Sequence, residues 1–440
     1  MNLKNNSSNN SKKGMLLLSI PVFFANLSTP LVGVIDTGLM GNLGETKYIA
    51  ALSVATSIIT MLIWSFGFLR MGTVGIVAQL FGKKDYREIV RTLIRNFLIA
   101  IIISIIVILL KPILINLTNN YFSTSLETQN LINTYLSIRI LSVPAELVIY
   151  ILIGFYLGLQ KTNISSLIVI TLSLLNIILS SLFVLSFKLD VFGVALGTMI
   201  ASYATAILFS LYAYKFIINK FLIIPKFERI IVPSKLLKLL NINLNIFIRT
   251  LFLTFSFLWI TYQGSKLGED YLAVNTILMQ FIILSAFFLD AYAYTTEGLV
   301  GFAIGRKNKN TFLLIVKNSI KISFITSIII SLVYLVFFKE IINLITDIEI
   351  LRYISYNYII WVIIIIPVAS FCYQLDGIFI GASQTQDMRN GMMISVASFL
   401  TISIYLVKYF DNHGLWFSLL LFMILRSLTL KLFFNKILRK

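Results

Sequence analysis

Long apolar runs alternate with short polar segments along almost the whole chain. Twelve of these runs have about 20 residues or more, the length that a helix needs to cross the hydrocarbon core of a bilayer. They lie at residues 15–39, 48–68, 97–117, 131–159, 164–187, 191–216, 236–263, 271–304, 312–338, 353–381, 392–410 and 415–438. Residues 1–14 are rich in Asn, Ser and Lys, and this composition predicts a disordered tail. The pattern predicts an all-α integral membrane protein with twelve transmembrane helices.

The basic residues are distributed unevenly between the polar segments. When the segments are taken alternately, the tail, the even-numbered connections and the C-terminus hold most of the 36 Lys and Arg residues, whereas the other connections hold more acids than bases. Short cytoplasmic loops are enriched in Lys and Arg. We therefore expect a multi-pass protein of the cell (inner) membrane with both termini in the cytoplasm. The formal net charge of +18 then reflects orientation in a lipid bilayer, and no nucleic-acid partner is predicted.

The composition also argues against several classes of protein. Hydrophobic residues make up 58% of the chain and charged residues only 12%, about half the charged fraction of a soluble domain. With one cysteine, Cys372, and one histidine, His413, neither a disulfide framework nor a usual His/Cys metal site is expected. No nucleophile, base or phosphate-binding glycine loop stands in or beside the runs. We predict that the protein is not an enzyme and needs neither a metal nor an organic cofactor.

A repeat joins the two halves of the chain. Residues 223 positions apart match in six places, namely Gly75 and Gly298, Gly82 and Gly305, Pro144 and Pro367, Gly154 and Gly377, Gly158 and Gly381, and Thr162 and Thr385. Six spans per half is an even number, so both halves enter the membrane in the same orientation and are expected to be related by a pseudo-two-fold axis along the membrane normal. The predicted domains are a cytoplasmic tail (1–14), a six-helix bundle (15–216), a cytoplasmic linker (217–235) and a second six-helix bundle (236–440).

Several segments of the chain have a familiar form. They are SIPVFFANLSTPLVGVIDTGLMGNLG, FGFLRMGTVGIVAQLFGKKD, NIFIRTL, ILMQF, LDAYAYTTEGLVG and LDGIFIGASQTQDMRN. Together they resemble the multidrug and toxic compound extrusion (MATE) transporters, in particular the branch named after DNA-damage-inducible protein F. The resemblance implies an antiporter, acting as a monomer, that exports small organic molecules, often cationic drugs or metabolites, in exchange for H⁺ or Na⁺ by alternating access.

A flippase for lipid-linked oligosaccharides, which belongs to the same superfold, is the alternative. Such a protein usually needs a basic cavity for an anionic headgroup. Five acids and three bases lie within the spans or at their ends, and this surplus of acids favours cationic cargo. The bases are Arg70, Arg139 and Arg249.

Four residues are candidates for cation coupling in the first half. The resemblance places the essential acid at Asp36, and it matches Asn176 and Thr198 to oxygen ligands of a proposed cation site. Where the family pattern has an aspartate four residues after Asn176, this chain has Ser180. Because a hard Na⁺ favours charged oxygen ligands, the loss of one carboxylate favours H⁺ over Na⁺. The family proline that bends the first span corresponds to Pro21.

Three further acids in the second half have two interpretations each. Asp290, Glu297 and Asp376 could bind substrate or a second cation, or could pair with Arg249 or Arg70, with pairing favoured for Glu297. Gln280, Tyr292 and Tyr294 are candidates to line a cavity because they neighbour these acids or the ILMQF segment.

Glu146 and Arg139, seven residues apart, are predicted to form a structural ion pair, and Arg249 is expected to be structural or to take part in gating. The sequence leaves the substrate and the coupling ion open.

Overall fold

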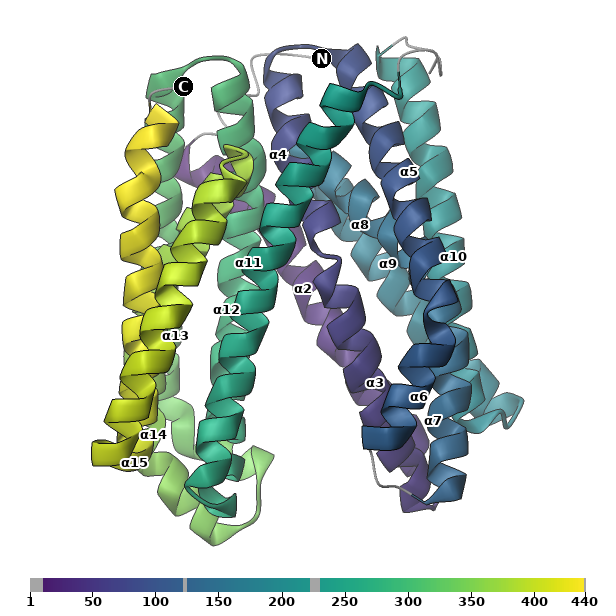
Figure 1. The fold of residues 1–440 in the computed structure, drawn as a ribbon, viewed down its shortest axis with the longest axis vertical. Coiled ribbons are helices and arrows are strands. Elements are labelled where there is room, and N and C mark those ends of the chain that lie inside the picture. The colour runs from purple at the N-terminus through teal and green to yellow at the C-terminus, as the bar shows by residue number, and fades with distance from the viewer. Residues whose placement is uncertain (1–10, 122–124, 222–229, 439–440) are drawn as a thin grey trace. The chain divides into compact units, whose positions relative to one another are not determined.

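The structure is a computed structural model that describes residues 11–121, 125–221 and 230–438. These residues form helices and turns, with no strand among them. Eleven helical segments of the described chain are long and apolar enough to cross a membrane. The last segment consists of two helices joined at Asp411, which has non-helical dihedral angles (φ 48°, ψ −131°). Twelve transmembrane helices result, and the predicted all-α membrane fold is confirmed (Figure 1).

The helices fall into two compact units. The N-terminal unit is Phe24–Leu240, and the C-terminal unit combines Met1–Phe23 with Asn241–Lys440. Helix α2 (Lys12–Gly41) therefore contributes its first part to the C-terminal unit and its remainder to the N-terminal unit. The boundary falls two residues after Pro21, which lacks the N–H that would continue the helical hydrogen bonding. The predicted bundle limits at 15–216 and 236–440 stay a prediction.

The N-terminal unit is built from short-linked helices. After α2 come α3 (Thr46–Ser65), α4 (Phe68–Gly82), α5 (Tyr86–Leu109), α6 (Lys111–Tyr121), α7 (Leu126–Arg139), the 3₁₀ turn η1 (Ile140–Ser142), α8 (Val143–Gly158), α9 (Thr162–Ser181) and α10 (Asp190–Phe216). Single π-helical turns, η2 (Leu182–Ser186) and η3 (Ile217–Phe221), extend α9 and α10. Helix α4 packs along α8, and α10 packs against α7, α8 and α9.

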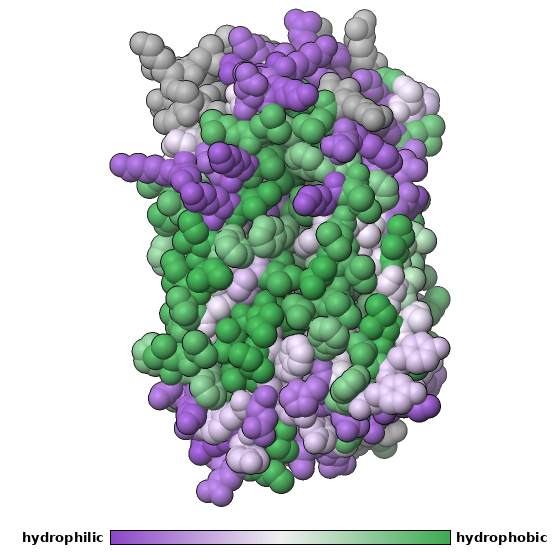
Figure 2. Space-filling model, turned by 90° about the vertical axis from the view of Figure 1, so that its left-hand side faces the viewer, coloured by the Kyte–Doolittle hydropathy of each residue, from purple (hydrophilic) through white to green (hydrophobic). Residues whose placement is uncertain are grey.

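The C-terminal unit contains the longer helices. They are α11 (Pro233–Lys266), which begins within the N-terminal unit, α12 (Glu269–Gly305), α13 (Lys309–Ile345), α14 (Glu349–Gly381) and α15 (Thr385–Leu438). Helix α14 lies against α12, α13 and α15. The apolar core includes Val362, Ile365, Phe399, Trp416 and Phe422. Figure 2 shows apolar side chains in a broad band between two polar ends on the side of this unit that carries α13 and α15, as lipid contact requires.

The sequence repeat is also a repeat of helix contacts. A Cβ added at Gly154 in α8 would lie 2.5 Å from the carbonyl oxygen of Arg70 in α4, and one added at Gly377 in α14 would lie 2.8 Å from that of Ala293 in α12. Arg70 and Ala293 are themselves 223 residues apart. Glycine is needed at both positions because it lets two membrane helices approach more closely than any side chain permits.

The turns between helices repeat in the same way. Three pairs of non-glycine residues with positive φ are each 223 residues apart: Lys84 and Lys307 (φ 61° and 54°), Gln160 and Ser383 (59° and 51°), and Lys188 and Asp411 (55° and 48°). The helix N-caps repeat at the same offset. Asp85 accepts a hydrogen bond from the backbone N–H of Glu88, and Asn308 accepts one from the backbone N–H of Thr311. The offset found in the sequence thus extends to the backbone conformation of both units.

Several helix boundaries differ from the prediction. The span expected at 97–117 is helix α5, which begins at Tyr86 and ends at Leu109. It begins earlier because Asp85 caps its first turn and the basic residues after it belong to the helix, and it ends earlier because Pro112 has no N–H to donate to the preceding turn. Helix α2 begins at Lys12, inside the expected tail, while residues 1–10 and part of the expected linker, 222–229, lie outside the described residues.

Candidate functional site

The residues predicted for cation coupling gather in the N-terminal unit. Asn176 of α9 donates from Nδ2 to Oγ1 of Thr198 in α10 over 2.8 Å, and Ser180 donates to Oδ1 of Asn176 over 3.4 Å. Asp36 of α2 is 6% exposed, and its carboxylate interacts with Ser180 and with Arg139. Oxygen Oδ1 of Asp36 is buried and has no hydrogen-bond partner among the described residues. The cluster therefore presents one buried carboxyl group with an idle oxygen beside neutral amide and hydroxyl groups.

Local packing accounts for the small side chain at position 180. Ser180 is completely buried, and a Cβ added at Gly197 of α10 would lie 2.7 Å from its backbone nitrogen and 2.9 Å from its Oγ. Helices α9 and α10 therefore meet backbone to backbone at this level. A serine fits the contact and still carries a hydroxyl group toward Asn176 and Asp36.

A buried ion pair adjoins Asp36. Arg139, at the end of α7, donates from Nη1 to Glu146 Oε1 at 2.5 Å and also to the hydroxyl of Ser142. Ser142 in turn donates to the same oxygen of Glu146 over 2.7 Å. Tyr135, one turn earlier in α7 and 3% exposed, interacts with Arg139, Asp36 and Glu146. The sequence predicts this pair but not its place beside Asp36.

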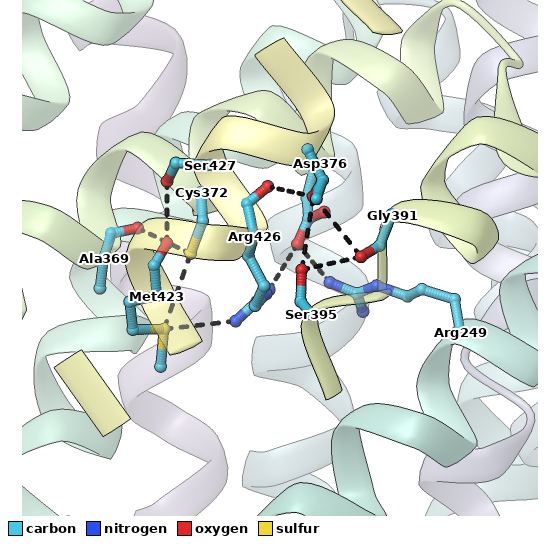
Figure 3. A network of polar contacts seen from close by, with 10 residues as sticks. Arg249, Ala369, Cys372, Asp376, Gly391, Ser395, Met423, Arg426 and Ser427 are labelled. Atoms are coloured by element: carbon cyan, nitrogen blue, oxygen red, sulfur yellow. Dashed lines mark hydrogen bonds and ion pairs between the residues drawn. The ribbon is translucent and has the colours of Figure 1, made fainter. Parts of the chain in front are cut away.

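A second charged network lies in the C-terminal unit (Figure 3). Asp376 of α14 accepts on a single oxygen, Oδ2, from Arg249 of α11 and from Arg426 of α15, the latter over 2.8 Å. All three side chains are buried, with exposed fractions of 8%, 6% and 2% respectively. Arg426 also contacts the sulfur of Met423 at 3.5 Å. One carboxylate thus joins three helices through two guanidinium groups.

The other predicted residues of this unit are more scattered. Glu297 is buried in α12 (1% exposed), and Asp290 is half-buried and acts electrostatically on Cys372 and Tyr373. Tyr294 is half-buried, whereas Gln280 is exposed and the structure does not bring it to the Asp376 network.

Tyr292 lines an apolar pocket. It accepts a hydrogen bond from Thr326 over 3.2 Å. The remaining lining residues are Leu16, Ser19, Ile20, Phe23, Phe288 and Ala291, all of the C-terminal unit.

Sequence reasoning missed three buried charged residues. The sequence pattern assigns Arg426 to the basic C-terminal segment and Arg95 to the loop before the third span, yet both residues are 2% exposed. The acid Asp387, expected in a connection, is 6% exposed as well, so buried acids and bases are nearly balanced and their count does not decide the charge of the cargo. For Arg426 the signal was present, because it interrupts the apolar run FMILRSL.

A resident metal is not indicated by the described residues. Among them no group of three or more His, Cys, Asp or Glu side chains is arranged to hold a metal ion. The buried carboxylates of Glu146 and Asp376 are already paired with arginines.

Twelve membrane-spanning helices, a duplicated six-span backbone and a buried acid in the first span define a membrane protein of the transporter class. The MatE family model matches residues 21–182 and 246–407, one match in each half of the repeat. The chain belongs to the MatE family.

Relatives agree with this assignment. The chain is 33% identical over 420 residues to DNA damage-inducible protein F of Escherichia coli, covering 96% of this chain and 91% of that protein. It is 29% identical over 203 residues to the multidrug export protein MepA of Staphylococcus saprophyticus, covering 46% and 44%.

Solved structures share the fold. One is an outward-facing multidrug resistance MATE family transporter of the MOP superfamily (TM-score 0.88, 16% identity, covering 98% of this chain and 97% of that one). Another is a MOP superfamily transporter from Pyrococcus furiosus, described as having a binding pocket of reverse polarity that suggests a different function (TM-score 0.86, 18% identity, the same coverage).

Proposed function

We propose that the protein is a proton-coupled antiporter that exports small organic cations by alternating access. It acts as a monomer in the cell (inner) membrane, with both termini in the cytoplasm. The observation that carries this proposal is Asp36, a buried carboxyl group with an idle oxygen in the first span of a MatE transporter. Ionisable residues within spans are costly and mark ion or proton pathways.

Proton coupling fits the ligands around this acid better than sodium coupling. Ser180, Asn176 and Thr198 contribute neutral oxygens, and Ser180 takes the place of a carboxylate that the family pattern has there. A protonated carboxyl group needs no further charge, whereas Na⁺ would need several oxygens close to Arg139, the cation that acts on Asp36.

The cargo contacts follow from two features. A buried acid that carries negative charge in one step of the cycle attracts a cationic group, and the apolar pocket beside Tyr292 is suited to aromatic or aliphatic parts of a drug. The flippase alternative has no comparable support in the described residues, because the arginines of the C-terminal network already face Asp376, with Asp290 close by.

The test uses inside-out vesicles that contain the protein. Uptake of ethidium, a cation, is compared with uptake of carboxyfluorescein, an anion, under an imposed proton gradient or an imposed sodium gradient. We expect ethidium uptake with protons alone, and its loss in Asp36→Asn. The matched control is Asp347→Asn, the same exchange at a fully exposed position, which should transport normally.

Other outcomes contradict specific parts of the proposal. Uptake driven by sodium alone would refute proton coupling. Preference for the anion would refute the cargo class. Unchanged transport in Asp36→Asn would show that Asp36 is not the coupling residue.

A further inference from the structure

Arg139 has an unused hydrogen-bond donor next to an acid with an unused acceptor. A guanidinium group carries five N–H donors. The described contacts with Glu146 and Ser142 use only Nη1, and Nε is buried without a hydrogen-bond partner among the described residues. Oδ1 of Asp36 is likewise buried and has no hydrogen-bond partner among the described residues. Idle buried polar atoms are rare and costly, so two of them on interacting side chains call for a state in which they are used.

The charges of the cluster point to what that state is. The groups that act on one another here are Asp36, Glu146, Arg139 and Tyr135, contributed by α2, α8 and α7, with the hydroxyls of Ser142 and Ser180 beside them. One guanidinium balances one carboxylate. A buried cluster with two carboxyl groups and one arginine is therefore neutral when it holds one proton.

Hydrogen bonding decides which acid holds that proton. Glu146 accepts hydrogen bonds on Oε1 from both Arg139 and Ser142. Asp36 has one buried oxygen with no donor among the described residues. Asp36 is thus the acid with room for the proton, and the unused N–H of Arg139 is the donor available when that proton leaves.

We propose that Arg139 is a tethered counter-ion shared by Glu146 and Asp36, which sets the pH at which Asp36 exchanges its proton and keeps sodium out of the site. It is a positioning residue, since it acts through Asp36. The proposal rests on the proposed function only in taking Asp36 as the coupling acid. Arg139 thus supplies a built-in positive charge, and a metal cation is disfavoured by repulsion at the same place.

Replacing each partner of the ion pair should shift the pH midpoint of transport in opposite directions. In Arg139→Gln the positive charge is lost, so Asp36 holds its proton more tightly and the midpoint of the transport pH profile moves up by about one pH unit or more. In Glu146→Gln the arginine is released to Asp36, so the midpoint moves down. Arg139→Lys keeps the charge and should restore a midpoint near that of the wild type.

Sodium and a control pair complete the transport measurement. The wild-type midpoint should be the same with and without sodium, whereas sodium should lower it in Arg139→Gln by competing with the proton. Arg352→Gln, which breaks the exposed pair with Asp347, is the matched control and should leave the profile unchanged. A purely structural ion pair would lower activity in both Arg139→Gln and Glu146→Gln without opposite shifts.

A second readout separates this proposal from the proposed function. Infrared difference spectra of the purified protein, recorded during a pH titration, report the carboxyl C=O band of Asp36, identified by its absence in Asp36→Asn. If the protein exported no drug under any gradient, this titration would still show whether the pH midpoint of the band shifts up in Arg139→Gln and down in Glu146→Gln. If Arg139→Gln does not fold, Glu146→Gln decides by itself, because the proposal requires a downward shift of the midpoint in that variant. Shifts of the same sign, or no shift, would overturn the proposal.

Discussion

The Asp376 network makes a quantitative prediction about stability. In Asp376→Asn the carboxylate between Arg249 and Arg426 becomes a neutral amide, which leaves two buried guanidinium groups facing each other without a counter-charge. Removing one partner of a buried ion pair costs about 3–5 kcal/mol. Because both arginines share the single oxygen Oδ2, their losses are not independent, and we expect the total to stay within that range.

A double-mutant cycle tests the cause of this loss. Asp376→Asn, Arg249→Met and the double variant are unfolded by sodium dodecyl sulfate in mixed micelles, with tryptophan fluorescence as the signal. Since the double variant buries one unpaired charge fewer than Asp376→Asn, it should be less destabilised than the sum of the single variants, by about 0.5–3 kcal/mol. Asp347→Asn, at an exposed pair, should change stability by less than about 1 kcal/mol. Additive losses, or a loss below about 1 kcal/mol in Asp376→Asn, would refute the reasoning.

The close helix contacts and the caps give two further predictions, both measured by the same unfolding assay. Gly377→Ala places a Cβ 2.8 Å from a carbonyl oxygen of α12 and should cost about 1–3 kcal/mol through overpacking. Gly38→Ala, in a helix with nothing within 4 Å, should instead gain about 0.5–1 kcal/mol; a loss there as large as at Gly377 would contradict the steric explanation. Asn308→Ala removes the side-chain cap of α13 and should cost about 1 kcal/mol, and an unchanged stability would show that the cap is not needed.

The fold was largely predictable because its causes are periodic. Apolar runs of bilayer length are visible in any sequence, and the glycines at 154 and 377 recur because the same helix contact recurs. The start of α5 was not predictable from hydropathy, since its first turns are charged and are fixed by the cap at Asp85. Its correct boundary depends on local hydrogen bonding, which a search for apolar runs ignores.

The candidate site was predictable only in part. The family resemblance points to Asp36, Asn176 and Ser180, and the structure brings them together. Arg426 was missed because a basic residue near a cytoplasmic terminus is ordinarily explained by membrane orientation. Its burial depends on Asp376, 50 positions earlier in the chain, and such a long-range pair leaves no local pattern in a single sequence.

The matching turns say something about how this molecule arose. At two of the three corresponding left-handed positions the side chains differ, glutamine against serine and lysine against aspartate, and only the pair Lys84 and Lys307 has the same residue. Shape has thus outlasted residue identity, as expected if one gene segment was copied and fused and its two copies then diverged. The two halves share their backbone conformation but carry their buried acids at different positions. Asp36 corresponds to Trp259 in the second half, and Asp376 corresponds to Ile153 in the first. A duplicated backbone would allow the charged network at Asp376 to evolve in one copy without changing the cluster at Asp36 in the other.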